Sequence, residues 1–363
     1  INIFTALATG GAVIAGQYLG RKDPKTGCEA TAQLFNFTFL FSIFIMILGY
    51  LGQNVILYHV FGKIEPEVMK DSRTYLLIVL ASIPMIAMYN AGAAIFRAMG
   101  NSNIAMKTSL LMNSINVFGN ALLIFEFHCG VEGVAIPTVV SRGVACVVIL
   151  VLLNNQEHAL HILHPYPFKI KWDVLKKILY IGIPNGLENS MFQLGKLAIQ
   201  SSVSTLGTVA IAAQAMTNIL ENLNGIAAIG VGIGLMTVVG QCLGAGRKDE
   251  AVYYIKKLSV LAEIIVVASC LLVFALTIPV TKLGGMESES ARMCFHMISW
   301  ITVVKPIVWT LAFIPAYGLR AAGDVKFSMI TSCCTMWACR FCLCVFLIRV
   351  MGFGPMGVWI GMF

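Results

Sequence analysis

The sequence predicts an all-α integral membrane protein built from two six-helix bundles, and three observations carry that prediction. Of its 363 residues, 58% are hydrophobic and 12% are charged, and the mean hydropathy is +0.84. Soluble globular chains carry about 25% charged residues, so half that fraction indicates a chain that lies in a bilayer. The other two observations are an internal repeat and the distribution of positive charge.

Three short motifs occur twice, in the same order and at nearly the same distance. GQYLGRKD begins at Gly16 and GQCLGAGRKD begins at Gly240, which lies 224 positions later (240 − 16). FRAMGN, which contains Arg97, is echoed by LRAAGD, which contains Arg320, at 223 positions (320 − 97). GVEGVA is echoed by GPMGVW at 224 positions (354 − 130). The pattern indicates a tandem duplication.

Apolar stretches of roughly 17–25 residues, the length that crosses a bilayer, follow one another along the chain. The first half holds a partial span at 1–19 and full spans at 31–51, 75–96, 105–125 and 131–153. The second half holds spans at 178–203, 210–239, 252–280, 295–317 and 327–348, and a further span that starts at 354. We therefore predict about eleven of twelve transmembrane helices, six in each complete half.

The predicted lobes are residues 1–153 and 176–363, joined by a polar cytoplasmic linker at 154–175. Matching the two halves suggests that the first lobe lacks helix one and part of helix two, and that helix twelve of the second lobe is incomplete. We expect such a clipped chain to be inactive by itself. An even number of helices per half places both halves in the membrane in the same orientation, related by a pseudo-twofold axis along the membrane normal.

Positive charge predicts which side is the cytoplasm. The side that carries both GQ-x-LG loops holds 15 Lys and Arg residues, and the opposite side holds 6. Cytoplasmic loops of membrane proteins carry the excess of Lys and Arg. The net charge of +8 therefore reflects membrane topology, and without a basic face with interleaved aromatic residues we expect no nucleic-acid partner.

A polar stripe runs along the span 178–203. Its members recur at steps of three and four residues, which places them on one helix face; they are Asn185, Glu188, Asn189, Gln193, Lys196 and Gln200. A continuous polar face cannot point at lipid, so it either lines a transport pathway or hydrogen-bonds to a neighbouring helix. The ionisable members favour the pathway.

The next span repeats the pattern with Gln214, Asn218 and Glu221. Glu188 and Glu221 are carboxylates on consecutive helices inside the membrane, so we predict that they bind a coupling cation, either Na⁺ or H⁺. Further candidates for the wall of a substrate cavity are the polar or charged residues inside other spans, namely Asn90, Asn113, Asn116, Asn120, Lys305 and Arg340. For the four asparagines, helix packing is an equally good account.

His158, His161 and His164 recur every third residue in the predicted linker. Steps of three drift around a helix, so a cytoplasmic linker explains them better than a metal site does. No nucleophile elbow, phosphate loop or paired-aspartate motif is visible, so the chain carries no enzyme signature. We expect neither a metal nor another cofactor.

Several motifs together resemble the multidrug and toxic compound extrusion family. They are GQCLGAGRKDEA at 240–251, FRAMGN at 96–101, GIPNGLENSMFQLGK at 182–196, NSINVFGNALLIF at 113–125 and GVEGVAIPT at 130–138. The resemblance covers essentially the whole chain. It implies a monomeric antiporter of the inner or plasma membrane that exports amphipathic, often cationic organic compounds in exchange for Na⁺ or H⁺, with two lobes that rock about a central cleft.

The residues keep one alternative to a drug exporter open and disfavour another. A flippase for lipid-linked oligosaccharides would use more cations in the cavity, as Lys196, Lys305 and Arg340 would supply. A membrane-embedded transferase would need paired acidic residues or His motifs at the interface, and none is visible.

Overall fold

The computed structural model describes residues 2–55, 57, 66–163 and 170–362. The helices of the first half are α1 (Asn2–Gly20), α2 (Pro24–Val55), α3 (Pro66–Ala81), α4 (Ile83–Ala98), α5 (Ser102–Ala121), the π-helical turn η2 (Leu122–Glu126) and α6 (Glu132–Leu153). The second half contains α7 (Trp172–Val203), η3 (Ser204–Leu206), α8 (Thr208–Gly244), α9 (Lys248–Leu283), α10 (Ser288–Ala322), α11 (Val325–Cys334), η4 (Thr335–Phe341), α12 (Cys342–Arg349) and α13 (Met356–Ile360). Within the described ranges no residue forms a strand, which confirms the all-α prediction.

The helices have the length and surface of membrane spans. Eight of those described are long and apolar enough to cross a bilayer, and α3 and α4 together would make a ninth. Large apolar side chains lie on the outside, among them Leu51, which is 76% exposed, and Leu311, which is 77% exposed. A soluble protein rarely exposes so much apolar surface to water, whereas the surface of a membrane protein contacts lipid tails, which are themselves apolar. The chain is a multi-pass membrane protein.

The predicted span at 75–96 is a bent pair of helices. α3 and α4 meet at Ser82 with an angle of 45°. Pro84 lies in the first turn of α4 and has no N–H to continue the helix of α3. The guanidinium of Arg142 donates to the Ser82 hydroxyl at 2.6 Å, so this charge inside α6 has a local partner at the bend.

The turns that carry the repeated motifs confirm the duplication in backbone geometry. Lys22 and Gly246, 224 positions apart (246 − 22), have left-handed φ angles of 60° and 77°. The next residue in each copy, Asp23 or Arg247, donates its N–H to the carbonyl five residues earlier, at 3.1 and 2.9 Å. A glycine adopts this conformation at no steric cost, so the second copy forms the turn more easily than the first, which uses a lysine.

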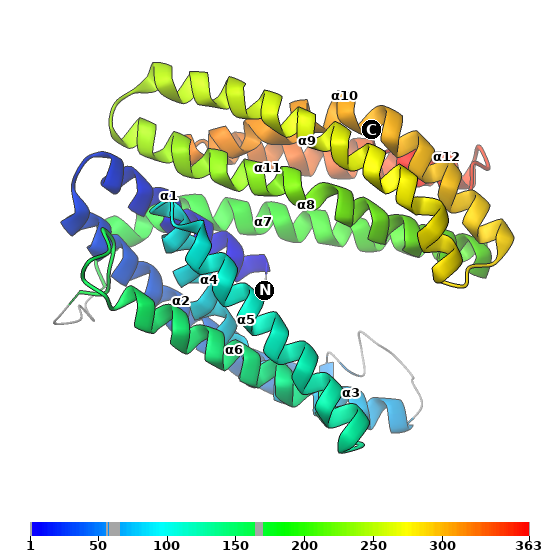
Figure 1. The fold of residues 1–363 in the computed structure, drawn as a ribbon, viewed down its shortest axis with the longest axis horizontal. Coiled ribbons are helices and arrows are strands. Elements are labelled where there is room, and N and C mark those ends of the chain that lie inside the picture. The colour runs from blue at the N-terminus through cyan, green and yellow to red at the C-terminus, as the bar shows by residue number, and fades with distance from the viewer. Residues whose placement is uncertain (1, 56, 58–65, 164–169, 363) are drawn as a thin grey trace. The chain divides into compact units, whose positions relative to one another are not determined.

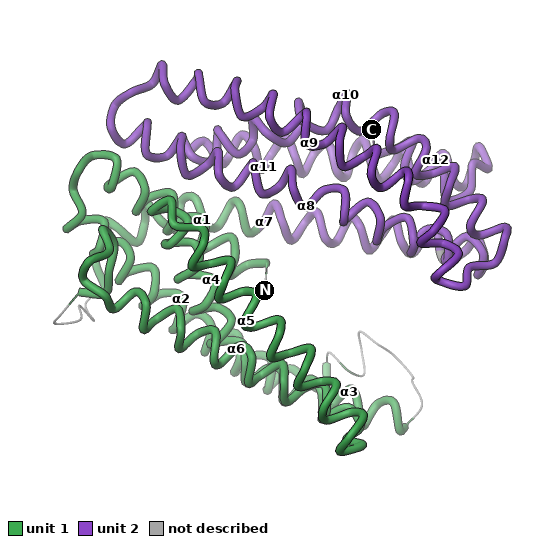
Figure 2. Tube along the Cα trace, in the orientation of Figure 1, with its two compact units in different colours: residues 1–186 green, residues 187–363 purple. Residues whose placement is uncertain are grey.

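The chain divides into two compact units, residues 1–186 and 187–363 (Figure 2). The division falls inside α7, so the assignment of 154–175 as the linker between lobes stays a prediction. In unit 1, α1 packs on α2 and α4, and α5 packs on α6; in unit 2, α8, α9 and α10 pack on one another (Figure 1).

Small residues let helices approach closely within unit 1. A Cβ at Gly10 of α1 would lie 2.7 Å from the carbonyl oxygen of Ile178 and 2.9 Å from the backbone nitrogen of Gly182. Both contacts are with backbone of α7, which cannot rotate away. Close backbone approach at small residues is a common way for helices to associate in lipid, so this glycine pair holds α1 against the first half of α7.

The Gly10 contact yields a stability prediction. Gly10→Ala should lower the free energy of unfolding by ~1–3 kcal/mol, the usual cost of overpacking. Gly16→Ala, on the same helix, is the matched control, because its Cβ would meet Ala98 at an ordinary 3.8 Å. Thermal unfolding of the purified protein in detergent measures both, and a Gly10→Ala variant as stable as Gly16→Ala would contradict the packing.

Candidate functional site

The second half of the predicted α7 stripe and the whole of the predicted α8 stripe line one cavity inside unit 2. The cavity has a volume of about 450 Å³. Three groups of polar side chains line it, contributed by α7, α8 and the π-helical turn η4; they are Gln193, Lys196 and Gln200, then Gln214, Asn218, Glu221 and Asn222, and finally Arg340. The apolar part of its wall comes from Leu197, Ile199, Val358, Trp359 and Met362.

Helical spacing explains why these residues share the cavity. The polar members run from Gln193 to Gln200 on α7 and from Gln214 to Asn222 on α8, each about two turns, so they lie along one face. A Cβ at Gly195 would collide with Met336, which shows that η4 lies directly against this part of α7. Arg340 follows in the same π-helical turn, and such turns occur frequently at functional sites.

Glu221 is ion-paired to a fully buried lysine. Lys305 Nζ of α10 lies 2.9 Å from Glu221 Oε1, and the Lys305 side chain is 0% exposed. The ammonium also lies 5.7 Å from the centroid of the Trp309 ring. A buried ammonium needs such a partner, because an unpaired charge away from water is costly. One oxygen of Glu221 is therefore occupied, and its charge is balanced.

Lys196 and Arg340 have a different environment. Both lie over the Phe192 ring, with Lys196 Nζ 5.1 Å and Arg340 Cζ 5.5 Å from its centroid. Arg340 Nη2 also donates to Met362 Sδ at 3.3 Å, whereas its Nε is buried without a hydrogen-bond partner. Across the described part of the chain, neither cation has a carboxylate within 4.0 Å.

The orientation of one amide in the wall follows from its neighbour. Trp359 Nε1 donates to Gln214 Oε1 at 3.0 Å, and both residues are buried. An indole N–H is a donor only, so it must face the amide oxygen. The NH₂ group of Gln214 is then left as the group that can donate to a ligand.

Glu188, the other predicted carboxylate, lies outside this cavity. Arg320 Nη2 of α10 donates to Glu188 Oε1 at 2.7 Å, and both side chains are largely buried. The Arg320 guanidinium also lies 5.3 Å from the Tyr317 ring centroid. Glu188 and Glu221 are thus each paired with a basic residue of α10, Arg320 and Lys305 respectively.

The other predicted site residues are not part of the wall of this cavity. Asn185 is buried with its Oδ1 unpartnered, and Asn189 is half-buried; neither lines the cavity. In unit 1, Asn116 donates to Thr138 Oγ1 at 3.0 Å and Asn120 donates to Asn116 Oδ1 at 3.2 Å. The first of these hydrogen bonds joins α5 to α6, as helix packing would require, and the second lies within α5.

Asn90 and Asn113 have contrasting surroundings in unit 1. Asn113 is exposed, and Nδ2 of Asn90 is buried with no partner in the described residues. In the predicted linker, the ring of His158 packs edge-on against Phe96 at 5.3 Å. His164 lies outside the described residues. No group of three potential metal ligands occurs among the residues that are described.

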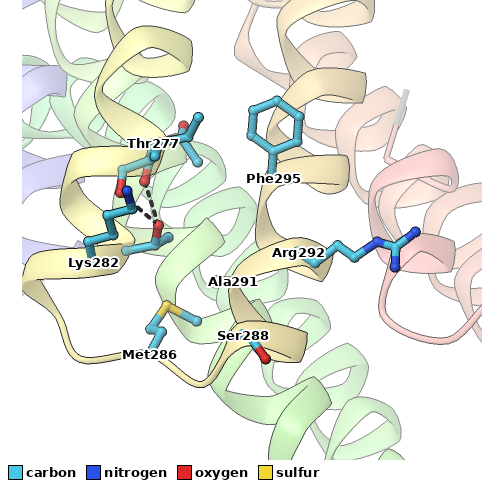
Figure 3. Close-up of a pocket in the computed structure, with 9 residues that line it drawn as sticks. Thr277, Lys282, Met286, Ser288, Ala291, Arg292 and Phe295 are labelled. Carbon is cyan, nitrogen blue, oxygen red and sulfur yellow. Dashed lines mark hydrogen bonds between the residues drawn. The ribbon is translucent and has the colours of Figure 1, made fainter.

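A second cavity of about 430 Å³ lies between the end of α9 and the start of α10 (Figure 3). The Thr281 hydroxyl there donates within its own helix, to the carbonyl of Thr277 at 2.9 Å. Lys282 and Arg292 contribute positive charge, but none of the sequence-predicted residues lines this cavity. The polar cavity between α7 and α8 is therefore the candidate site.

Sequence reasoning missed three residues of these environments. Arg320 belongs to the motif that repeats that of Arg97, and both arginines lie in the last turn of a helix. Trp359 and Met362 lie near the end of the chain, and no pattern in the sequence relates them to α7 or α8. Of these three residues, only Arg320 lies in a repeated motif, so it is the only one that a sequence pattern could have selected.

Comparisons with known proteins place the chain in a family. A family model described as MatE matches residues 1–122 and 184–346, one match in each half. The uncharacterized transporter YisQ of Bacillus subtilis is 25% identical over 366 residues, which cover 99% of this chain and 79% of that protein. The probable multidrug resistance protein NorM of Thermotoga maritima is 25% identical over 317 residues, covering 85% of this chain and 66% of that protein.

Solved structures share the fold. A MOP superfamily transporter from Pyrococcus furiosus superposes with a TM-score of 0.90 at 19% identity, over 100% of this chain and 80% of that one. A multidrug resistance MATE family transporter in an outward-facing conformation has a TM-score of 0.86 at 18% identity, over 99% of this chain and 81% of that one. The family model covers most of the chain, and the paired matches fit its internal repeat. The chain therefore belongs to the MatE family, the multidrug and toxic compound extrusion transporters that its sequence resembles.

Proposed function

We propose that this protein is a secondary antiporter of the inner or plasma membrane that exports small amphipathic organic compounds from the cytoplasm. The observation that carries the proposal is the polar cavity of about 450 Å³ inside unit 2 of a multi-pass membrane protein. Ionisable side chains at membrane depth are expensive and mark transport pathways. Membership of a transporter family supports the same function.

The exchanged cation, Na⁺ or H⁺, acts in this proposal at the two paired carboxylates. Glu221 lines the cavity and uses Oε1 for Lys305, which leaves Oε2 for a second partner. Glu188 is held by Arg320 in the same way. A cation bound at either carboxylate competes with the basic residue of α10 for the negative charge and so weakens that ion pair. That competition couples cation binding to the packing of α10 against α7 or α8, and so to alternating access of the cavity.

The alternative of a lipid-linked oligosaccharide flippase is supported by the same cavity. Its wall contains Lys196 and Arg340, and Lys305 lies behind Glu221. Such cations would hold the phosphate of a lipid-linked substrate.

Gradient-driven export tests the proposed function. In proteoliposomes, either a Na⁺ or a H⁺ gradient should drive export of ethidium or of 1-pyrenebutyrate, one an organic cation and the other an organic anion. Glu188→Gln and Glu221→Gln should abolish the gradient dependence, because each removes the charge that binds the coupling ion. Glu263→Gln, which neutralises a carboxylate of α9 outside the cavity, is the control and should retain it. Transport indifferent to both gradients and both substitutions would refute the proposal.

A double-variant cycle separates coupling from stability. Glu221→Gln leaves the Lys305 ammonium buried without its carboxylate, which should destabilise the protein by ~3–5 kcal/mol. Adding Lys305→Met removes the unpaired charge and should restore most of that stability, as measured by thermal unfolding. Gradient-driven export should stay absent in the double variant. If export returns together with stability, Glu221 has only a structural role.

A further inference from the structure

The charges at the cavity do not balance. Glu221 and Lys305 neutralise each other at 2.9 Å. Lys196 and Arg340 also line the cavity, and the described residues provide no carboxylate within ion-pair distance of either. The site therefore carries two uncompensated positive charges. A cavity lined by one sign of charge concentrates ions of the opposite sign.

The two cations can serve one ligand. Both lie within 5.5 Å of the centroid of the Phe192 ring, so they flank the same side chain. Arg340 has a buried Nε–H that lacks an acceptor, and a guanidinium binds carboxylate, sulfonate or phosphate oxygens through two parallel N–H bonds. The NH₂ group of Gln214, oriented by Trp359, adds a further donor.

The rest of the wall suits an apolar body. Leu197, Ile199, Val358 and Trp359 line the cavity beside the polar groups. A ligand with a flat or aliphatic body and an anionic end satisfies both parts. An organic cation would instead meet Lys196 and Arg340, and Glu221, its natural partner, is already paired.

We infer that the cavity binds the anionic group of an amphipathic organic anion, held by Lys196 and Arg340. This inference rests on the proposed transport function, because it assigns the substrate class of the same cavity, and it replaces the cationic class that the family resemblance implies. The anionic group could belong to a free organic acid or to the headgroup of a lipid. Both present the same oxygens to the site.

Binding of two matched probes tests the inference without any gradient. 1-Pyrenebutyrate and 1-pyrenemethylammonium share one aromatic body and differ in charge. Their affinities for the purified protein in phosphatidylcholine nanodiscs are measured by pyrene fluorescence, with empty nanodiscs as the blank. The anion should bind at least about tenfold more tightly than the cation, as expected for a hydrogen-bonded charge pair.

The variants assign the binding to the two cations. Lys196→Gln and Arg340→Gln should each weaken pyrenebutyrate binding about tenfold or more, whereas Lys196→Arg, which keeps the charge, should retain most of it. Lys256→Gln is the control for a lost positive charge, because Lys256 is exposed on α9 outside the cavity. Thermal unfolding establishes that each variant is folded. Tighter binding of the cation, or anion binding unchanged by both substitutions in folded protein, would overturn the inference.

Nanodiscs with added phosphatidylglycerol distinguish the two sources of the anion. If a lipid headgroup occupies the site, the added lipid should weaken pyrenebutyrate binding to the wild type, and Lys196→Gln should remove that competition. If a free organic acid is the ligand, affinity should be the same in both nanodiscs. Anion binding that depends on Lys196 in a protein without gradient-driven export would refute the proposed function and leave the anion site intact. Gradient-driven export of ethidium without Lys196-dependent anion binding would refute the anion site and leave the proposed transport function intact.

Discussion

The buried ion pair between Lys305 and Glu221 determines the chemistry of the cavity. An ammonium that is 0% exposed is costly without a carboxylate beside it, so the pair ties α10 to α8 at this depth. It also removes from the charge balance the one carboxylate that the described residues contribute to the cavity wall. The character of the site is then set by the remaining cations, Lys196 and Arg340, although the sequence contains an acidic residue at the cavity.

α10 supplies a basic partner to each of the two carboxylates in the polar stripes of α7 and α8. Lys305 pairs with Glu221 and Arg320 pairs with Glu188, so one helix supplies the counter-charges for α8 and α7. Breaking either pair is costly in lipid, where water cannot take over the lost interaction. In the proposed mechanism, a ligand or ion that binds one of these carboxylates weakens its ion pair and so acts on the position of α10.

The duplication is visible at every level of the chain. Repeated motifs become turns with the same backbone hydrogen bonds, and the family model matches once in each half. The polar residues differ between the halves: at the repeat offset of 224 (340 − 116), Asn116 of α5, which donates to Thr138 of α6, corresponds to Arg340 of η4, which lines the cavity. Equivalent frameworks have therefore acquired different side-chain chemistry.

The sequence by itself determined the membrane class, the repeat, the helices and the helix faces, because these depend on composition and on spacing of three and four residues. It also named seven polar or charged residues of the cavity wall, from Gln193 to Arg340, since a polar face on a membrane helix has few places to point. The tertiary structure decided which charges are neutralised. Lys305, Arg320 and Trp359 reach their partners across 84, 132 and 145 positions of chain. Pairing at such distances depends on how helices pack, and no local periodicity encodes it.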